Sequence, residues 1–283
     1  MEFRQDVRPS PIAGRWYTDN PELLTQEVDA YISEAKLGED DIGGEVVGIL
    51  APHAGYRYSG RTAGYAYRSV QGKPRQLVVV LSPFHHFIAG KFVTTAHGAY
   101  ETPLGAVGVE VDLLNELEKA MAEAGLKLGQ TAEDEEHSLE IQLPFLQRAW
   151  KTDFRLLPVM IRSRSREEVE TFAGCLYETM KDEDYLLVAS SDLSHFYPQS
   201  TAEEMDAEML RRVKEFDPEA VLTAEAEGEA SACGAAAIAA MQWAARKAGA
   251  DKVNILNYST SADTTGDRSS VVGYGAAVVV KSK

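Results

Sequence analysis

Histidine and aspartate side chains follow three strongly apolar segments of this 283-residue chain. The segments and the residues behind them are 46–50 with His53, 76–81 with His85, and 185–190 with Asp192 and His195. Short apolar runs of this kind predict buried strands. In open α/β sheets, ligands and chemistry collect at the carboxyl ends of the strands. The recurrence therefore predicts one shared active or metal-binding site at that edge.

The chemistry that fits these residue types best is metal binding. Imidazole is the commonest protein ligand for Zn, Fe, Cu and Ni. The chain has no H-E-x-x-H motif, so its ligands would have to converge from separate strand ends. Cys233 is a further candidate, because it opens the Ala-rich segment 233–241 and the start of a helix lowers the pKa of a thiol. A thiolate there could bind a metal or act as a nucleophile, and a small packed core cysteine is an equal alternative.

Nucleophilic catalysis is the rival chemistry. Cys233 with a histidine and an aspartate could form a triad of the kind used in acyl transfer. The serines Ser190, Ser191 and Ser194 also lie near Asp192, but the absence of a G-x-S-x-G motif weakens a serine hydrolase. Neither a P-loop motif nor G-x-G-x-x-G occurs, so nucleotide binding has no motif behind it.

Composition narrows the classes of partner. The formal net charge of −16 argues against a general DNA or RNA binder, which needs clustered lysine and arginine. The densest basic run, residues 162–166, is interpreted as a solvated loop before a helix. Two cysteines are too few for a disulfide framework. The chain has no apolar run long enough for a membrane span and no signal peptide at its start, so we expect no membrane partner and a cytoplasmic location.

The elements that must position these residues alternate between strands and helices. This alternation predicts an α/β fold, with a mixed, largely parallel sheet and helices on both faces, as a single domain over residues 1–283. A short helix is expected over 60–67, after the turn that carries His53. The internal Pro158 predicts that strand 155–161 lies at a sheet edge or carries a bulge.

Seven stretches of the chain together resemble the MEMO family, named after a mediator of ErbB2-driven cell motility and including archaeal and bacterial relatives. The stretches are Gly14-Arg15-Trp16-Tyr17, Ala51-Pro52-His53-Ala54-Gly55-Tyr56, Ser82-Pro83-Phe84-His85-His86, Thr102-Pro103-Leu104-Gly105, Asp134-Glu135-Glu136-His137-Ser138-Leu139-Glu140, Ser190-Ser191-Asp192 with His195, and Ala232-Cys233-Gly234. They span nearly the whole chain in one order. Microbial members are also called AmmeMemoRadiSam system protein B, which implies AMMECR-type and radical-SAM proteins as partners.

The resemblance implies the fold of class III extradiol ring-cleavage dioxygenases, which is called LigB-like. It also implies that His53, His85 and Cys233 are metal ligands. Cys233 stands where the dioxygenases have a carboxylate, which argues against ring cleavage itself. Two imidazoles and a thiolate suit Fe or Cu, and also Zn.

The same resemblance suggests roles for the neighbouring residues. His195, oriented or charge-balanced by Asp192, is expected to donate or accept protons beside the metal. His86 and His137 are expected behind the ligands, with Glu135 or Glu136 fixing a histidine tautomer. Tyr56 is expected to line the pocket.

The leading hypothesis is therefore a metal-binding protein of redox or O₂ chemistry, a dioxygenase-like oxidoreductase if it is an enzyme. One alternative is a module that binds peptides or phosphopeptides in the same pocket, against which the acidic composition argues mildly. Another is a cysteine-dependent hydrolase.

Overall fold

The computed structural model describes residues 1, 3–86, 90–132 and 134–282. Its strands are β1 (Arg4–Arg8), β2 (Gly44–Ala51), β3 (Leu77–Ser82), β4 (Phe92–Thr95), β5 (His97–Tyr100), β6 (Val107–Gly108), β7 (Leu128–Thr131), β8 (Arg155–Ile161), β9 (Tyr185–Ser190), β10 (His195–Tyr197), β11 (Lys252–Thr260) and β12 (Val271–Ser282). Its helices are α1 (Pro21–Glu34), α2 (Glu39–Ile42), α3 (Tyr56–Val70), α4 (Val111–Glu123), α5 (His137–Glu140), α6 (Leu143–Trp150), α7 (Arg166–Met180), α8 (Gln199–Lys214), α9 (Pro218–Glu227), α10 (Ala235–Lys247) and α11 (Ala262–Thr265).

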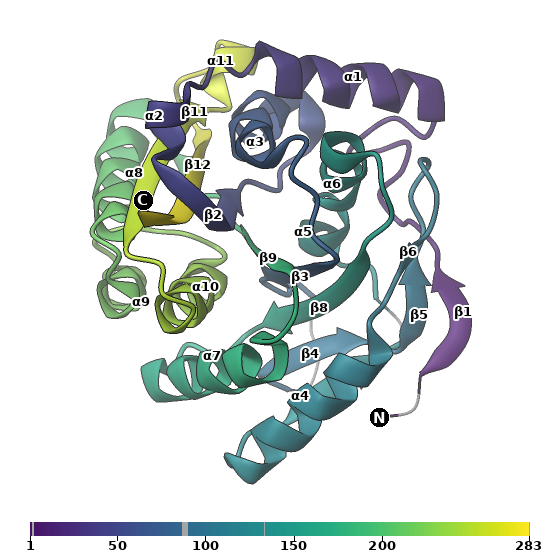
Figure 1. The fold of residues 1–283 in the computed structure, drawn as a ribbon. Helices are drawn as coiled ribbons and strands as arrows, with labels where there is room; N and C mark the ends of the chain where they lie inside the picture. Colours follow the sequence, from purple (N-terminus) through teal and green to yellow (C-terminus); the bar gives the residue numbers. More distant parts are fainter. Residues whose placement is uncertain (2, 87–89, 133, 283) are drawn as a thin grey trace.

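The described strands form a nine-stranded sheet and a small sheet of β1, β5 and β6 (Figure 1). In the large sheet the order is β10-β12-β2-β9-β3-β8-β4-β7, and β11 pairs with β12. The centre, β2-β9-β3-β8, is parallel, whereas β12 and β4 join it in antiparallel pairing. The predicted mixed α/β sheet is confirmed, with its parallel part confined mainly to the centre.

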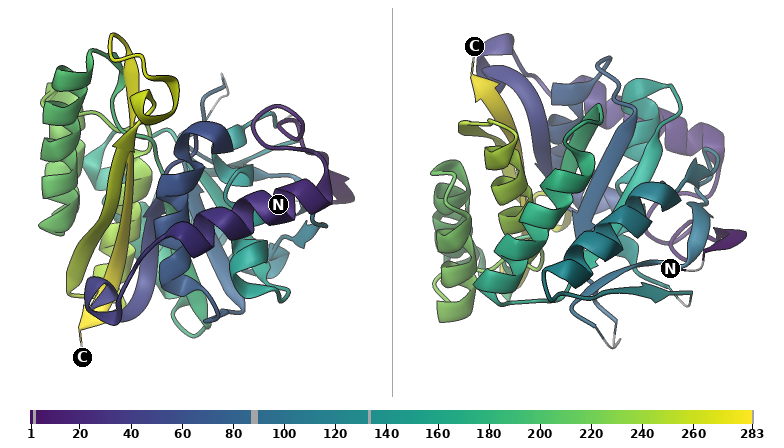
Figure 2. Two further views of the ribbon diagram at one scale, coloured as in Figure 1. Left: turned by 90° about the horizontal axis from the view of Figure 1, so that it is seen from above. Right: turned by 60° about the horizontal axis from the view of Figure 1, so that its bottom comes forward.

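Apolar side chains on both faces of the central strands account for the two helix layers. In β3, Leu77, Val79 and Leu81 point into one core, and Val78 and Val80 into the other, as the alternation of side chains along a strand requires. Helices α4, α7 and α10 cover the first core, and α1, α3 and α6 cover the second (Figure 2). The predicted helices on both faces are confirmed.

One local prediction is wrong, and another gives a helix that is correct but too short. Strand β8 is not an edge strand, because it lies between β3 and β4. Its ladder to β4 covers only Met160 and Ile161, so the N–H that Pro158 lacks is not needed on that side. The helix expected over 60–67 begins already at Tyr56 and ends at Val70, since the turn after His53 leads directly into it.

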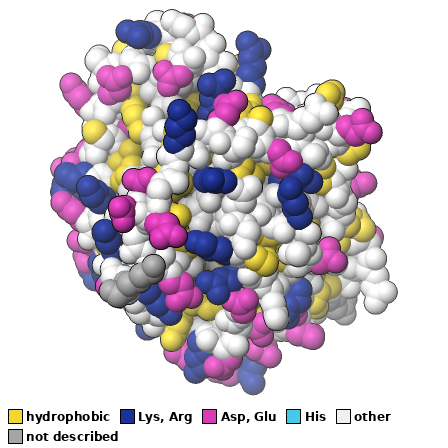
Figure 3. Space-filling view, turned by 45° about the horizontal axis from the view of Figure 1, so that its top comes forward, with side chains coloured by type: hydrophobic (Ala, Val, Ile, Leu, Met, Phe, Trp, Pro, Cys, Tyr) yellow, Lys and Arg dark blue, Asp and Glu magenta, His cyan; other side chains and the backbone are white. Residues whose placement is uncertain are grey.

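One face of the molecule carries charged side chains of both signs. On the face shown in Figure 3, lysine and arginine side chains are interspersed with aspartate and glutamate. Among the described helices, none is both long and apolar enough to cross a bilayer.

Candidate metal centre

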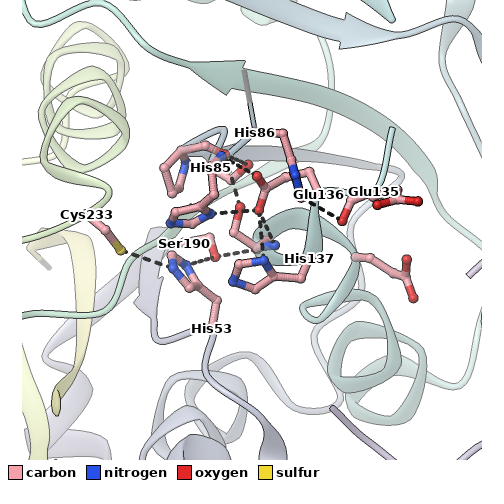
Figure 4. Close-up of polar contacts among 12 residues, drawn as sticks. His53, His85, His86, Glu135, Glu136, His137, Ser190 and Cys233 are labelled. Carbon is pink, nitrogen blue, oxygen red and sulfur yellow. Dashed lines mark hydrogen bonds and ion pairs between the residues drawn. The ribbon is translucent and has the colours of Figure 1, made fainter. Parts of the chain in front are cut away.

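Three histidines meet at the carboxyl edge of the central strands (Figure 4). His53 follows β2, His85 follows β3, and His137 opens the short helix α5. Their candidate ligand atoms all lie within 4.8 Å of one another. The three rings are 4.7 to 5.4 Å apart between centroids. Three imidazole nitrogens so close together could hold a metal ion.

The His53 imidazole is held from behind by a neutral network. Its Nδ1 lies 3.0 Å from Oγ of Ser190, and that hydroxyl donates its one proton to the Ser138 carbonyl. Ser190 therefore accepts from His53. Nε2 of Gln142 also donates to Ser190, at 2.7 Å, and to the Pro52 carbonyl, which fixes the orientation of the amide. His53 thus carries its proton on Nδ1 and presents the lone pair of Nε2.

The His85 imidazole is held by a carboxylate instead. Its Nδ1 lies 2.9 Å from Oε1 of Glu136, and its backbone N–H donates to the other carboxylate oxygen. The same Oε1 accepts the Ser138 N–H at 2.8 Å and lies 3.3 Å from Nδ1 of His137. One buried carboxylate therefore contacts two of the three histidines. That Glu135 or Glu136 fixes a histidine tautomer stays a prediction.

Burial and charge give the three imidazoles different basicities. Burial, followed by the charges of His137 and His85, holds the pKa of His53 well below its usual value. Burial lowers the pKa of His137 to about 4, although Glu136 opposes this. For His85 the hydrogen bond and charge of Glu136 outweigh burial and raise the pKa. His53 and His137 are therefore neutral at pH 7, the form in which imidazole binds a metal.

Cys233 approaches the cluster from the opposite side (Figure 4). Its Sγ lies 3.0 Å from Nε2 of His53. A side chain at Gly234 would lie 2.4 Å from the Ser190 carbonyl oxygen, so glycine lets this segment press against the end of β9. The expected low pKa of the thiol is wrong, because burial and then the charge of Asp192 raise it far above the usual value. The protonated thiol can donate to the lone pair of His53.

Asp192 and His195 lie next to this site but do not act on each other as expected. Oδ1 of Asp192 accepts the backbone N–H groups of His53, at 2.7 Å, and Ala54. Burial raises the pKa of Asp192 to about 7 against these hydrogen bonds. The His195 ring is oriented by the Leu193 carbonyl, 2.8 Å from Nδ1. Since a carbonyl only accepts, His195 carries its proton on Nδ1 and leaves Nε2 as a base.

The remaining expected residues lie at the margin of the cluster. His86 is exposed, and its Nε2 lies 3.2 Å from the Glu135 carbonyl oxygen. Tyr56 is buried, and its hydroxyl donates to the Ile141 carbonyl at 2.7 Å. Its ring packs on Phe145, 4.9 Å away between centroids. Tyr56 thus joins α3 to α6 beneath the site.

Trp16 contacts the cluster, although the sequence alone did not single it out as a site residue. Its ring stacks on His137 with centroids 4.0 Å apart. The Trp16 carbonyl accepts the N–H of Tyr56, and a side chain at Gly55 would lie 3.2 Å from that oxygen. The only sequence signal was its place in a family-like stretch. Trp16 therefore covers one face of the histidine cluster.

Arg8 supports the segment that carries Glu136 and His137. Its side chain is 1% exposed and donates to Asp134, to Glu140 and to the Glu136 carbonyl. A charge is buried at this depth only when it is paired, and removing one partner of such a pair costs about 3–5 kcal/mol. No spacing or motif marks this arginine, because its partners lie more than a hundred residues away.

Asp206 anchors the loop that carries His195. It is fully buried, and its Oδ1 accepts the Ser194 N–H at 2.8 Å. Its Oδ2 accepts the Tyr258 hydroxyl, also at 2.8 Å. Burial raises the pKa of Asp206 above the usual 3.8, and the nearby Glu203 adds to the shift.

The raised pKa predicts how stability depends on pH. The folded chain holds the Asp206 proton more tightly than the unfolded chain, so this stabilisation is complete below about pH 3.8 and is lost as pH rises through the folded pKa. Asp206→Asn keeps the acceptor for Ser194 and removes the titration. Urea unfolding at pH 4 and pH 8 should show the wild type losing stability relative to this variant as pH rises. A difference that stays constant would contradict the prediction.

Known proteins of one family match nearly the full length of the chain. A MEMO1 family protein of Nitrosopumilus maritimus is 34% identical over 276 residues, covering 95% of this chain and 98% of the relative. A MEMO1 family protein from Methanothermobacter thermautotrophicus is 33% identical, and the match covers 95% of this chain and 98% of the relative. The solved structure of uncharacterized protein JW3007 from Escherichia coli K12 has a TM-score of 0.49 and 15% identity, over 83% of this chain and 100% of that one, a likeness too low to carry an argument. The family model described as Memo-like protein matches residues 8–278. The chain therefore belongs to the Memo-like protein family.

Proposed function

We propose that this chain holds an iron or copper ion at the histidine cluster and acts in redox or O₂ chemistry. The observation that carries the proposal is the convergence of His53, His85 and His137. Hydrogen bonds from behind occupy Nδ1 of His53 and His85 and leave each Nε2 to bind a metal. Metal-ligating histidines are typically held in this way.

The donor set fits several metals, and either of two residues could complete it. His137 belongs to the compact cluster, and Cys233 contacts Nε2 of His53. Imidazole with thiolate suits Fe and Cu, and also Zn. The thiol would have to lose its proton to bind, which requires a cation to offset the cost of burying a thiolate.

The residues of the chain would then supply protons and exclude water. A bound iron or copper ion would supply one-electron or O₂ chemistry. His195, with its proton on Nδ1 and its pKa lowered by burial, offers Nε2 as a base beside the centre. Trp16 limits access to the His137 side.

A cysteine-dependent hydrolase is the second candidate, favoured by the 3.0 Å contact between Cys233 Sγ and His53 Nε2. The raised pKa of the thiol argues against it, since the thiolate is the nucleophile. Alkylation of Cys233 that stops turnover in metal-free protein would favour the hydrolase. A cytoplasmic location and association with AMMECR-type and radical-SAM proteins stay predictions.

Metal analysis of protein purified without added metal tests the proposal. The wild type should contain iron or copper, and His53→Ala should lose it, because His53 belongs to both candidate ligand sets. His97→Ala is the matched control, since His97 is a buried histidine bound to Asp6 and the Ala132 carbonyl. Comparing His137→Ala with Cys233→Ser identifies the third ligand. Equal metal content in the wild type and His53→Ala would overturn the proposal.

A second prediction concerns Glu136, which orients two histidines. Glu136→Gln keeps the shape of the side chain and removes its charge, so metal affinity should fall about 10–100-fold. Glu135→Gln, a change at the exposed neighbouring glutamate, should leave affinity unchanged. Competition with a chelator measures both variants. Equal affinities would show that the Glu136 charge has no such role.

A further inference from the structure

A cavity of about 700 Å³ lies between α1, α3, β11 and α11, and none of the candidate metal ligands lines it. Figure 1 shows these four elements together at the top of the molecule. Thr264 of α11 donates to the Arg57 carbonyl at the start of α3, which joins two of its walls. The volume is within the usual range for sites that bind small molecules. The cavity therefore has room for a ligand apart from the histidine cluster.

A β-bulge in β11 turns Asn257 toward this cavity. The ladder to β12 pairs Ile255 and Asn257 with consecutive residues and leaves out Leu256. Leu256 packs into the core that α1 and α3 cover, and Asn257 bonds to Thr62 of α3, so two neighbouring side chains face the same side of the sheet. Along a regular strand they would face opposite sides. Bulges are common next to functional sites, where they re-aim a side chain.

The amide of Asn257 keeps a free donor. Oγ1 of Thr62 donates its one proton to Oδ1 of Asn257, at 3.1 Å, so the Ser259 hydroxyl, 2.5 Å away, must donate to Thr62. Within the part of the chain that the structure describes, Nδ2 of Asn257 has no partner. All three residues line the cavity. This wall therefore offers the amide of Asn257 as a donor and the oxygen of Ser259 as an acceptor.

Tyrosine side chains line the neighbouring walls, namely Tyr31 of α1 and Tyr58 and Tyr65 of α3. The Tyr31 hydroxyl donates to Glu27 at 3.1 Å. The hydroxyls of Tyr58 and Tyr65 have no hydrogen-bond partner among the described residues, and Tyr58 is 40% exposed. A tyrosine combines an apolar ring with a polar hydroxyl. These walls therefore suit a ligand that has an apolar face and polar edges.

Charged side chains of both signs complete the lining of the cavity. They are the basic Arg57 and Arg61 and the acidic Glu27, Glu34 and Asp263. Neither arginine forms an ion pair with any described residue. The arginines would repel a cation and the carboxylates an anion. A hydroxyl group both donates and accepts, so a neutral ligand with several hydroxyls can bond to both kinds of side chain.

We infer that this cavity binds a neutral sugar, with a ring of the size of a hexose. The C–H face of the sugar ring would lie against the Tyr58 ring. Its hydroxyls would accept hydrogen bonds from Asn257 and Arg61 and donate to the carboxylates. The inference goes beyond the proposed function, because it concerns a separate site and needs no metal.

Saturation-transfer NMR with a matched set of sugars tests the inference. The probes are glucose, galactose and mannose, the amino and 6-phosphate derivatives of the same hexoses, and cyclohexanol as a ring with a single hydroxyl. At least one neutral hexose should bind, and it should bind better than its charged derivatives and cyclohexanol. Absence of binding by all three hexoses, or a preference for a charged derivative, would overturn the inference.

Variants with matched controls locate the site. Tyr58→Ala, Arg61→Ala and Asn257→Asp should each weaken binding of that hexose about tenfold, since each removes one contact with it. Asn257→Asp keeps the acceptor for Thr62 and removes only the free donor. The controls are Tyr197→Ala, at a tyrosine that is 41% exposed, and Arg68→Ala, at an exposed arginine of α3 that bonds to Gln71. Neither control residue lines the cavity, so equal weakening by the controls would overturn the inference.

Discussion

The arrangement of the histidine cluster depends on one buried carboxylate, that of Glu136. It accepts the side-chain and backbone N–H groups of His85 and the N–H of Ser138, and it lies beside His137. Burial opposes its ionisation, but the hydrogen bonds and the charges of His85 and His137 outweigh burial and hold its pKa far below the usual value. Arg8 in turn binds the Glu136 carbonyl and the neighbouring acids. Both oxygens of this carboxylate therefore accept hydrogen bonds, and Arg8 fixes the backbone that carries it.

The two histidines at the ends of β2 and β3 are supported by different chemistry. His85 has a charged partner, which makes it the more basic of the two. His53 has a neutral partner in Ser190, and burial keeps it unprotonated. Together with Arg162, which follows β8, they lie along the carboxyl edge of the parallel central strands. The order of the strands therefore sets the order of chemical groups along this edge.

Much of this edge could be predicted from the sequence, because continuous apolar runs indicate buried strands. The carboxyl ends of neighbouring parallel strands must then lie at the same edge of the sheet. His53, His85 and His195 were placed correctly after their strands for that reason. His137 was expected behind the ligands and not among them, since it opens a short helix instead of following a strand. The contacts of Trp16 and Arg8 depend on packing between distant segments, which no local pattern encodes.

The chemistry of individual groups was harder to predict than their position. The start of a helix suggested a reactive thiolate at Cys233, yet burial and the charge of Asp192 have the opposite effect on its pKa. Asp192 was expected to act on His195, but its carboxylate accepts backbone N–H groups near His53. The pKa of Cys233 depends on how deeply its thiol is buried, and the role of Asp192 depends on which N–H groups lie nearest to its carboxylate. Both are known only from the folded structure.

The central claim is that these imidazoles bind a metal ion, and anomalous X-ray scattering from crystals of protein purified without added metal tests it most directly. Data collected on both sides of the iron and copper absorption edges should show one strong peak within bonding distance of Nε2 of His53 and Nε2 of His85. Absence of a peak at that position, or a peak only elsewhere on the molecule, would contradict the account.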